Sequence, residues 1–195
     1  MGIGHQVKKF HKAVFLDQDG TLIQYVDLLT KLADIRLLPK VAGAIRKMNR
    51  LGFSVFIITN QPVVARGLIS EGGVRKIERR VIALLAQQGA NIDGFLFCPH
   101  HPEATIKKYR KRCVCRKPEP GMILKAARKY HLDLKKSFMI GDSFIDIVAG
   151  HRAGIPSILV KTGPGHERLD AIYKNEKPDF KAKNLLEAVK FICKK

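Results

Sequence analysis

The sequence predicts an α/β protein of three layers (α/β/α), with a Rossmann-like parallel sheet between two layers of helices, and three observations predict it. Short apolar and β-branched runs that suit buried strands recur along the chain. Longer stretches with apolar residues at helical spacing lie between most of them. The chain of 195 residues is 46% apolar, which is ample for one core and thin for two. We therefore expect a single domain over residues 1–195 whose parallel strands are joined by right-handed crossovers.

The strands are predicted from apolar runs of four to six residues. They cover Ala13–Leu16, Ser54–Thr59, Gly94–Phe97, Ser137–Ile140 and Ser157–Val160. These runs are rich in apolar and β-branched residues, and their alternation with helical stretches predicts a parallel sheet.

The helices are predicted from apolar periodicity together with the residues that end them. They cover about 41–51, 74–85, 122–130 and 145–149, and a final strand or turn followed by an amphipathic helix is expected over 178–195. Gly52 and Gly89 follow the first two periodic stretches, as a glycine in the left-handed conformation often does. Gly154 and Pro156 end the fourth. Two segments fit neither pattern, namely 22–39 and 98–120, and we expect them to be loops at the sheet edge where ligands bind.

The chain is strongly basic, with 36 Lys and Arg against 17 Asp and Glu, a formal charge of +19. Such a charge attracts anions, whether phosphates, nucleic acid or acidic lipids. No apolar stretch approaches the roughly 20 residues that cross a bilayer, and the basic start at 1–12 has no apolar core behind it. We expect a cytoplasmic protein with no membrane partner, and a monomer, because no surplus apolar helix indicates an interface.

The first predicted strand runs into Asp17-Gln18-Asp19-Gly20-Thr21. Two carboxylates so close repel each other unless a hard cation such as Mg²⁺ lies between them. One of them can attack a phosphoryl group while the other protonates the leaving oxygen and later activates water. A solvated turn after a strand is the simpler alternative for this motif alone.

Two further strand ends carry fitting groups. The Thr59 hydroxyl or the Asn60 amide can bond a phosphoryl oxygen, although Thr-Asn after a strand is often only a turn. Asp142 follows the fourth strand and Asp146 lies one helical turn later, so both can face one cation, although an Asp near a helix start is commonly only a cap. Three such sites at one sheet edge favour a shared function over coincidence.

These residues, together with Lys117, resemble the motifs of the haloacid dehalogenase superfamily of phosphotransferases, in the same order and over nearly the whole chain. The resemblance implies that Asp17 is the nucleophile that becomes aspartyl-phosphate and that Asp19 is the general acid and base. It also implies that Thr59 binds phosphate and that Lys117 stabilises the transferring phosphoryl group. Phosphoryl transfer depends mainly on positioning and charge neutralisation, which agrees with these roles.

The same resemblance implies a magnesium site. The ligands would be the Asp17 carboxylate, the Asp19 backbone carbonyl and Asp142, with Asp146 in support.

A second constellation consists of Cys98, His100, Cys113 and Cys115 in the loop at about 98–116. Three thiolates and one imidazole suit a closed tetrahedral Zn²⁺ site, which is structural and would pin a loop that has little core of its own. His101 is the competing imidazole, and free cysteines beside a surface histidine are the alternative. We expect Cys193, far along the chain, to be a small apolar core residue.

The segment 98–122 resembles the zinc loop of one branch of the superfamily, the D-glycero-D-manno-heptose-1,7-bisphosphate 7-phosphatases, which are relatives of histidinol-phosphate phosphatases. The resemblance implies a Mg²⁺-dependent phosphate-monoester hydrolase with a minimal cap, acting on a small phosphorylated sugar of heptose metabolism. Arg116 would contact the substrate or its second phosphate, and Asn60 and Lys117 would also bind the substrate. Arg66 is expected to be structural or at the rim of the site. Histidinol phosphate and other sugar phosphates are the alternatives.

The sequence departs from this branch at Gln18, where many relatives have Arg, at Pro62-Val63 and at Ser143. The flap at 22–39, with Tyr25 and Asp27, resembles the heptose enzymes only faintly. The resemblance of the whole chain therefore predicts the reaction more firmly than the sugar.

The basic run at 107–117 also suits a function of another class, a zinc-stabilised nucleic-acid-binding module, or a polynucleotide phosphatase that combines both. Tyr109 is the one aromatic residue between 107 and 117, whereas single-stranded nucleic acid is usually bound on a series of aromatic side chains. We therefore expect no nucleic-acid partner.

Overall fold

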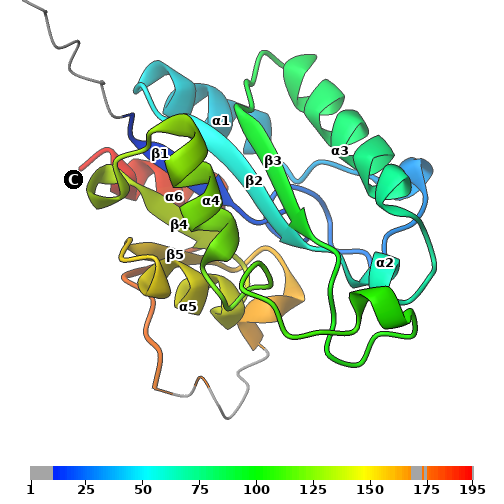
Figure 1. The fold of residues 1–195 in the computed structure, drawn as a ribbon. Coiled ribbons are helices and arrows are strands. Elements are labelled where there is room, and N and C mark those ends of the chain that lie inside the picture. Colours follow the sequence, from blue (N-terminus) through cyan, green and yellow to red (C-terminus); the bar gives the residue numbers. More distant parts are fainter. Residues whose placement is uncertain (1–10, 168–172, 174, 195) are drawn as a thin grey trace, which may run out of the picture.

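The computed structural model describes residues 11–167, 173 and 175–194 (Figure 1). Its sheet has six strands in the order β3-β2-β1-β4-β5-β6, and every neighbouring pair is parallel. The strands are β1 (Ala13–Leu16), β2 (Ser54–Asn60), β3 (Gly94–Cys98), β4 (Phe138–Gly141), β5 (Ser157–Val160) and β6 (Phe180–Ala182). The predicted parallel α/β sheet is confirmed, and the predicted alternative of a strand or a turn before the last helix resolves as β6.

Helices cover both faces of the sheet, as predicted. One face carries α1 (Val41–Arg50), α3 (Glu71–Ala86) and α6 (Leu185–Ile192), and the other carries α4 (Gly121–Tyr130) and α5 (Phe144–Arg152). The short helices are α2 (Pro62–Ala65), η1 (Leu32–Asp34), η2 (Lys107–Tyr109), η3 (Leu134–Lys136) and η4 (Pro164–Glu167).

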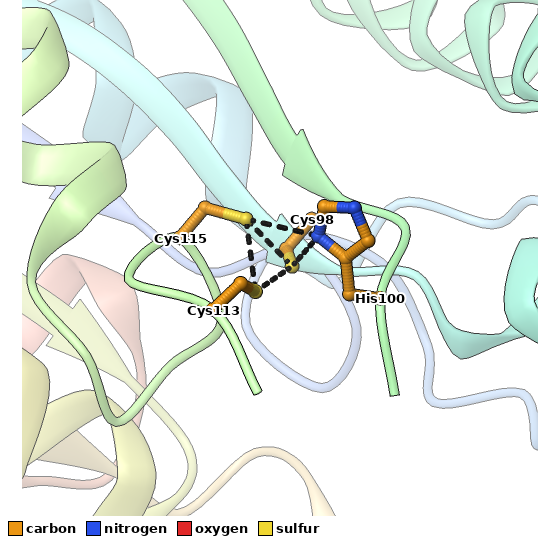
Figure 2. A group of neighbouring side chains, drawn as sticks. All are labelled: Cys98, His100, Cys113 and Cys115. Atoms are coloured by element: carbon orange, nitrogen blue, oxygen red, sulfur yellow. Dashed lines mark hydrogen bonds between the residues drawn. The ribbon is translucent and has the colours of Figure 1, made fainter. Parts of the chain in front are cut away.

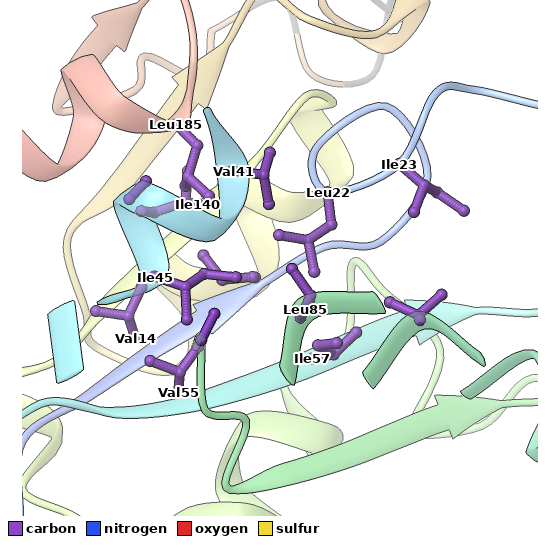
Figure 3. Close-up of a cluster of buried hydrophobic side chains, with 14 of the residues drawn as sticks. Val14, Leu22, Ile23, Val41, Ile45, Val55, Ile57, Leu85, Ile140 and Leu185 are labelled. Atoms are coloured by element: carbon purple, nitrogen blue, oxygen red, sulfur yellow. The ribbon is translucent and has the colours of Figure 1, made fainter. Parts of the chain in front are cut away.

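The strands are buried on both faces because alternate side chains enter two different cores. Val14 and Val55 pack with the helices of the larger core, between the sheet and α1, α3 and α6 (Figure 3). Phe15 and Phe56 point to the opposite face, where their rings stack 5.6 Å apart beside α4. This arrangement explains why the strand sequences are apolar without alternation.

The strand order places β1 beside β4, at the point where the chain connections turn in opposite directions across the sheet. Ligands of open parallel sheets bind at the carboxyl ends of the strands at such a point. The two limbs of the flap between β1 and α1 pair with each other, since Gln24 N–H donates to the Arg36 carbonyl at 2.9 Å and Leu38 N–H to that of Leu22 at 3.0 Å. Flap residues 25–29 line a cavity together with residues at this edge of the sheet.

One prediction about the core is wrong. Cys193 follows the last residue of α6 and is exposed, because the buried stripe of that helix consists of Leu185, Ala188, Val189 and Ile192. In the part of the chain that the structure describes, no helix is both long and apolar enough to cross a bilayer.

Candidate active site

The turn after β1 brings two acidic residues to the sheet edge. The Gln18 carbonyl accepts N–H groups from Leu22 at 2.9 Å and Ile23 at 3.1 Å, so the chain turns back sharply at once. Gly20 has φ of 81°, a left-handed conformation that favours glycine. Asp17 N–H donates to the Ile140 carbonyl of β4 at 3.0 Å, which joins the turn to the neighbouring strand.

Lys117 lies at the centre of the acidic residues. Its Nζ is 2.7 Å from Oδ1 of Asp17 and 2.7 Å from Oδ1 of Asp146, and it donates to the Ile58 carbonyl at 3.0 Å. Burial disfavours the charge on Lys117, but Asp146 and Asp17 outweigh it, so its pKa lies above the ordinary value. Lys117 is therefore a fixed cation beside Asp17.

Asn60 holds the backbone of Lys117. Its Nδ2 donates to the Lys117 carbonyl at 2.9 Å, and its Oδ1 accepts the Lys117 N–H at 3.0 Å. Both polar atoms of the Asn60 amide therefore form hydrogen bonds with the Lys117 backbone. The contact of Asn60 with substrate stays a prediction.

Asp146 also caps a helix. Its Oδ2 accepts the Ser143 N–H at 3.1 Å, as part of a reciprocal capping box at the start of α5. The predicted helix cap is found, and the other oxygen of this carboxylate contacts Lys117. The predicted support of a metal ion by Asp146 stays a prediction.

Asp142 is held by a segment that the sequence analysis did not identify. Gly165 N–H donates to Asp142 Oδ2 at 3.0 Å, and Thr162 Oγ1 donates to the Gly20 carbonyl at 2.6 Å. A Cβ on Gly163 would lie 2.1 Å from Asp142 Oδ2, so only glycine fits there. The signal that could have revealed this contact is Thr162-Gly163-Pro164-Gly165, which follows β5 at the same sheet edge.

The acidic residues fit a hard divalent cation. Asp17, Asp142 and Asp146 each offer a carboxylate oxygen, and these oxygens all lie within 4.8 Å of one another. Burial, followed by repulsion from Asp17, raises the pKa of Asp142 to about 6 and that of Asp19 to about 7. Burial also raises the pKa of Asp146 to about 7, although Lys117 opposes the rise. A cation with oxygen ligands would relieve this repulsion.

A cavity of about 220 Å³ opens above these groups. Thr59 and Lys117 line it, and so do the flap residues Tyr25 to Leu29. Arg116 is not among the described residues that line the cavity, and its Nη1 donates to the His100 carbonyl at 3.1 Å. Arg66 is exposed.

The four predicted zinc ligands come together. Cys98 ends β3 and His100 follows it, while Cys113 and Cys115 approach from the other side of the loop (Figure 2). Cys98 Sγ lies 2.9 Å from Cys115 Sγ and 3.6 Å from His100 Nδ1. The hydrogen bond between the Cys98 and Cys115 thiols lowers the pKa of Cys115 to about 5 and raises that of Cys98.

His101 is not part of the cluster of four. Its Nδ1 accepts the Glu103 N–H at 3.1 Å, and burial, followed by the charge of Arg116, lowers its pKa. The structure therefore favours His100 as the fourth ligand.

Comparison with known proteins agrees with this geometry. A family profile described as HAD-hydrolase-like matches residues 114–188. The chain is 49% identical, over 74% of its length and 80% of the relative, to a D-glycero-beta-D-manno-heptose-1,7-bisphosphate 7-phosphatase of Rhodopseudomonas palustris. The chain belongs to the HAD-like phosphatases. The resemblance inferred from the motifs is thereby confirmed.

Other HAD-like phosphatases extend the comparison. The chain is 41% identical, over 78% of its length and 84% of the relative, to a D-glycero-alpha-D-manno-heptose-1,7-bisphosphate 7-phosphatase of Photorhabdus laumondii subsp. laumondii. It superposes with a TM-score of 0.81 on a crystal structure of D,D-heptose 1,7-bisphosphate phosphatase from B. bronchiseptica, complexed with magnesium and phosphate. That structure is 31% identical, and the match covers 94% of this chain and 98% of the other.

Two glutamines of this HAD-like phosphatase belong to the site although their role was not foreseen. Gln18 and Gln61 both contact the Asp19 carboxylate. Both stand next to motif residues in the sequence, but no spacing rule indicates that their amides converge on one oxygen.

Proposed function

We propose that the protein, as one domain over residues 1–195, hydrolyses the 7-phosphate of D-glycero-D-manno-heptose 1,7-bisphosphate. The observation that carries the reaction is the position of Lys117 between Asp17 and Asp146, beside a cavity at the sheet edge. The names of the similar phosphatases support the substrate. These names include both anomers, so the anomer is a matter for experiment.

In the proposed reaction an Asp17 carboxylate oxygen attacks phosphorus. As the bond from phosphorus to the leaving oxygen breaks, Asp19 gives its proton to that oxygen and the sugar leaves as an alcohol. Asp19, now a carboxylate, takes a proton from water while the water oxygen attacks phosphorus. The bond from phosphorus to Asp17 then breaks, which releases orthophosphate and restores both carboxyl groups.

Charge neutralisation accompanies both steps. The Lys117 ammonium, 2.7 Å from Asp17 Oδ1, would contact phosphoryl oxygens on that side, and the Thr59 hydroxyl would donate to another. The Asp17 and Asp142 carboxylates and the Asp19 carbonyl would hold Mg²⁺, whose donor set they fit. When bound, Mg²⁺ supplies positive charge that phosphoryl transfer requires.

The Cys98, His100, Cys113 and Cys115 cluster would hold a structural Zn²⁺. Four protein ligands fill a tetrahedral site and leave no position for water. Because Cys115 lies two residues before Lys117, binding at this cluster would also fix the backbone that carries the central cation.

Phosphate release from a substrate panel tests the proposal. The panel contains both heptose 1,7-bisphosphate anomers, histidinol phosphate, hexose phosphates and a 3′-phosphorylated oligonucleotide, each with and without Mg²⁺. A hundredfold preference in kcat/KM for a heptose bisphosphate, about 3 kcal/mol of discrimination, is the expected result. Equal activity on all sugars would refute the named substrate alone. Mg²⁺-dependent activity on the oligonucleotide instead would replace it with a polynucleotide phosphatase.

We further propose that the protein is a monomer, that it is cytoplasmic and that it has no nucleic-acid partner. Light scattering after size-exclusion chromatography tests the first. A gel shift with a random oligonucleotide over a range of salt tests the last, since a charge-driven contact weakens steeply with salt.

A further inference from the structure

Gln61 makes two side-chain contacts with groups that the proposed reaction uses. It follows β2, its side chain is buried, and its backbone N–H donates to the Cys98 carbonyl at 2.8 Å. Its Nε2 lies 3.0 Å from Thr59 Oγ1 and 3.2 Å from Asp19 Oδ2. A primary amide has two N–H donors, so these two contacts use both of them.

Gln18 adds a second donor to the same carboxylate oxygen. Its Nε2 lies 3.2 Å from Asp19 Oδ2, and its side chain is fully buried. The other oxygen, Asp19 Oδ1, is buried and has no hydrogen-bond partner among the described residues. Both amide contacts are therefore made through Oδ2, and together they fix the orientation of the Asp19 carboxyl group.

The contact with Thr59 has a similar directional effect. The Thr59 hydroxyl accepts an N–H from Gln61, so one lone pair is occupied and its own O–H hydrogen points elsewhere. A hydroxyl held in this way is ready to donate to a phosphoryl oxygen.

From these contacts we propose that Gln61 is a positioning residue, which fixes the Asp19 carboxyl group for proton transfer to the leaving oxygen and orients the Thr59 O–H toward the phosphoryl group, with Gln18 reinforcing only the first. The inference rests on the proposed phosphatase reaction. Gln61 itself forms no bond to phosphorus and carries no proton. The proton passes from the Asp19 carboxyl group to the leaving oxygen as the ester bond breaks.

The dependence of kcat/KM on the leaving group tests the first part of the proposal, the positioning of Asp19. The variant Gln61→Met keeps side-chain length and loses both donors, and kcat/KM is measured for an alkyl phosphate and for p-nitrophenyl phosphate. An alkoxide must be protonated as it leaves, whereas p-nitrophenolate leaves without a proton, and kcat/KM includes only steps up to that departure. We expect the loss on the alkyl phosphate to exceed the loss on p-nitrophenyl phosphate by about tenfold or more. Gln18→Met should show the same direction.

Binding of orthophosphate, measured by calorimetry, tests the second part of the proposal, the orientation of the Thr59 hydroxyl group. Gln61→Met should weaken binding severalfold, while Gln18→Met leaves it unchanged, because Gln18 does not contact Thr59 in the structure. Gln87→Met is the matched control, since Gln87 is exposed at the end of α3, and it should behave as the native protein in both assays.

Equal losses on both substrates, together with unchanged phosphate binding, would reduce Gln61 to a structural role and overturn the inference. If Gln61→Met does not fold, as judged by circular dichroism, Gln61→Glu takes its place, because it has the same size and replaces the donors by acceptors. A native protein that hydrolyses neither of these substrates nor heptose 1,7-bisphosphate with Mg²⁺ would refute the proposed function instead. Phosphate binding would then still decide whether Gln61 orients the Thr59 hydroxyl group.

Discussion

Lys117 and Asp146 form a buried ion pair in which Nζ lies 2.7 Å from Oδ1, and the Asp146 side chain has no exposed area. The same carboxylate caps α5 through its other oxygen. A single side chain therefore joins the Lys117 ammonium group to the helix that follows β4, which couples the stability of the protein to the geometry of this cluster.

Replacing Asp146 with Ala should destabilise the protein strongly. The change leaves the buried Lys117 with one anionic partner fewer and removes the cap of α5, and removing one partner of a buried pair costs about 3–5 kcal/mol. Urea denaturation measures the loss. The control is Glu78→Ala on α3, which breaks the more exposed pair with Arg75 and should cost below about 1 kcal/mol. Equal losses in the two variants would contradict the central position of Asp146.

Asp17→Asn should abolish turnover while the fold and the zinc content stay intact. An amide in place of the carboxylate is a poor nucleophile, so the expected fall in kcat exceeds about a thousandfold. Phosphate release measures turnover, and Asp34→Asn, an exposed residue of η1, is the control. Activity within tenfold of the native value would exclude Asp17 as the nucleophile.

Cys113→Ser should lose bound zinc, because one of four ligands disappears from the cluster. Elemental analysis of the purified variant measures zinc per chain, and limited proteolysis reports on loosening of the loop. Cys193→Ser is a matched control, since Cys193 is exposed and outside the cluster. Full zinc occupancy in Cys113→Ser would show that the ligand set is wrong.

The stabilisation of the protein by Mg²⁺ should grow with pH. Without metal, burial and repulsion raise the pKa of Asp19, Asp142 and Asp146 to about 7, 6 and 7, above the ordinary 3.8. Between pH 4 and 7 the folded state therefore binds more protons than the unfolded state, and these groups lower stability as pH rises. Mg²⁺ binds the ionised form, so the rise in Tm on adding it should be larger at pH 8 than at pH 5. A shift that is larger at pH 5 would contradict the site.

Gly163→Ala should impair both activity and Mg²⁺ binding. The added Cβ would lie 2.1 Å from Asp142 Oδ2 and 2.6 Å from Gly20 Cα, so either the carboxylate or the turn after β1 must move. Gly43→Ala is the control, because the nearest atom to a Cβ there is 3.8 Å away, and alanine within helix α1 should stabilise the protein by about 0.5–1 kcal/mol. Calorimetric titration with Mg²⁺ and phosphate release measure the two effects, and native values for Gly163→Ala would refute the tight contact.

The sequence by itself determined the sheet, its helices and the residue types at its carboxyl edge. Apolar runs and glycine signals placed the strands and helices to within a few residues, because burial on both faces of a parallel sheet demands such runs. The positions of Asp17 and Asp142 after parallel strands predicted that they lie close together, since the carboxyl ends of such strands meet at one edge. Residue types predicted the cluster of three cysteines and one histidine.

Only the tertiary structure decided which partner each side chain takes. Asn60 forms hydrogen bonds with the backbone of Lys117, and Gln61 forms one with the Asp19 carboxylate. Both contacts join segments that lie far apart in the chain. Cys193 is exposed because the packing of α6 selects its buried stripe, which residue type does not specify. Hydrogen bonds are directional and extend about 3 Å, so the choice among polar partners depends on distances that appear only when the strands and loops have packed.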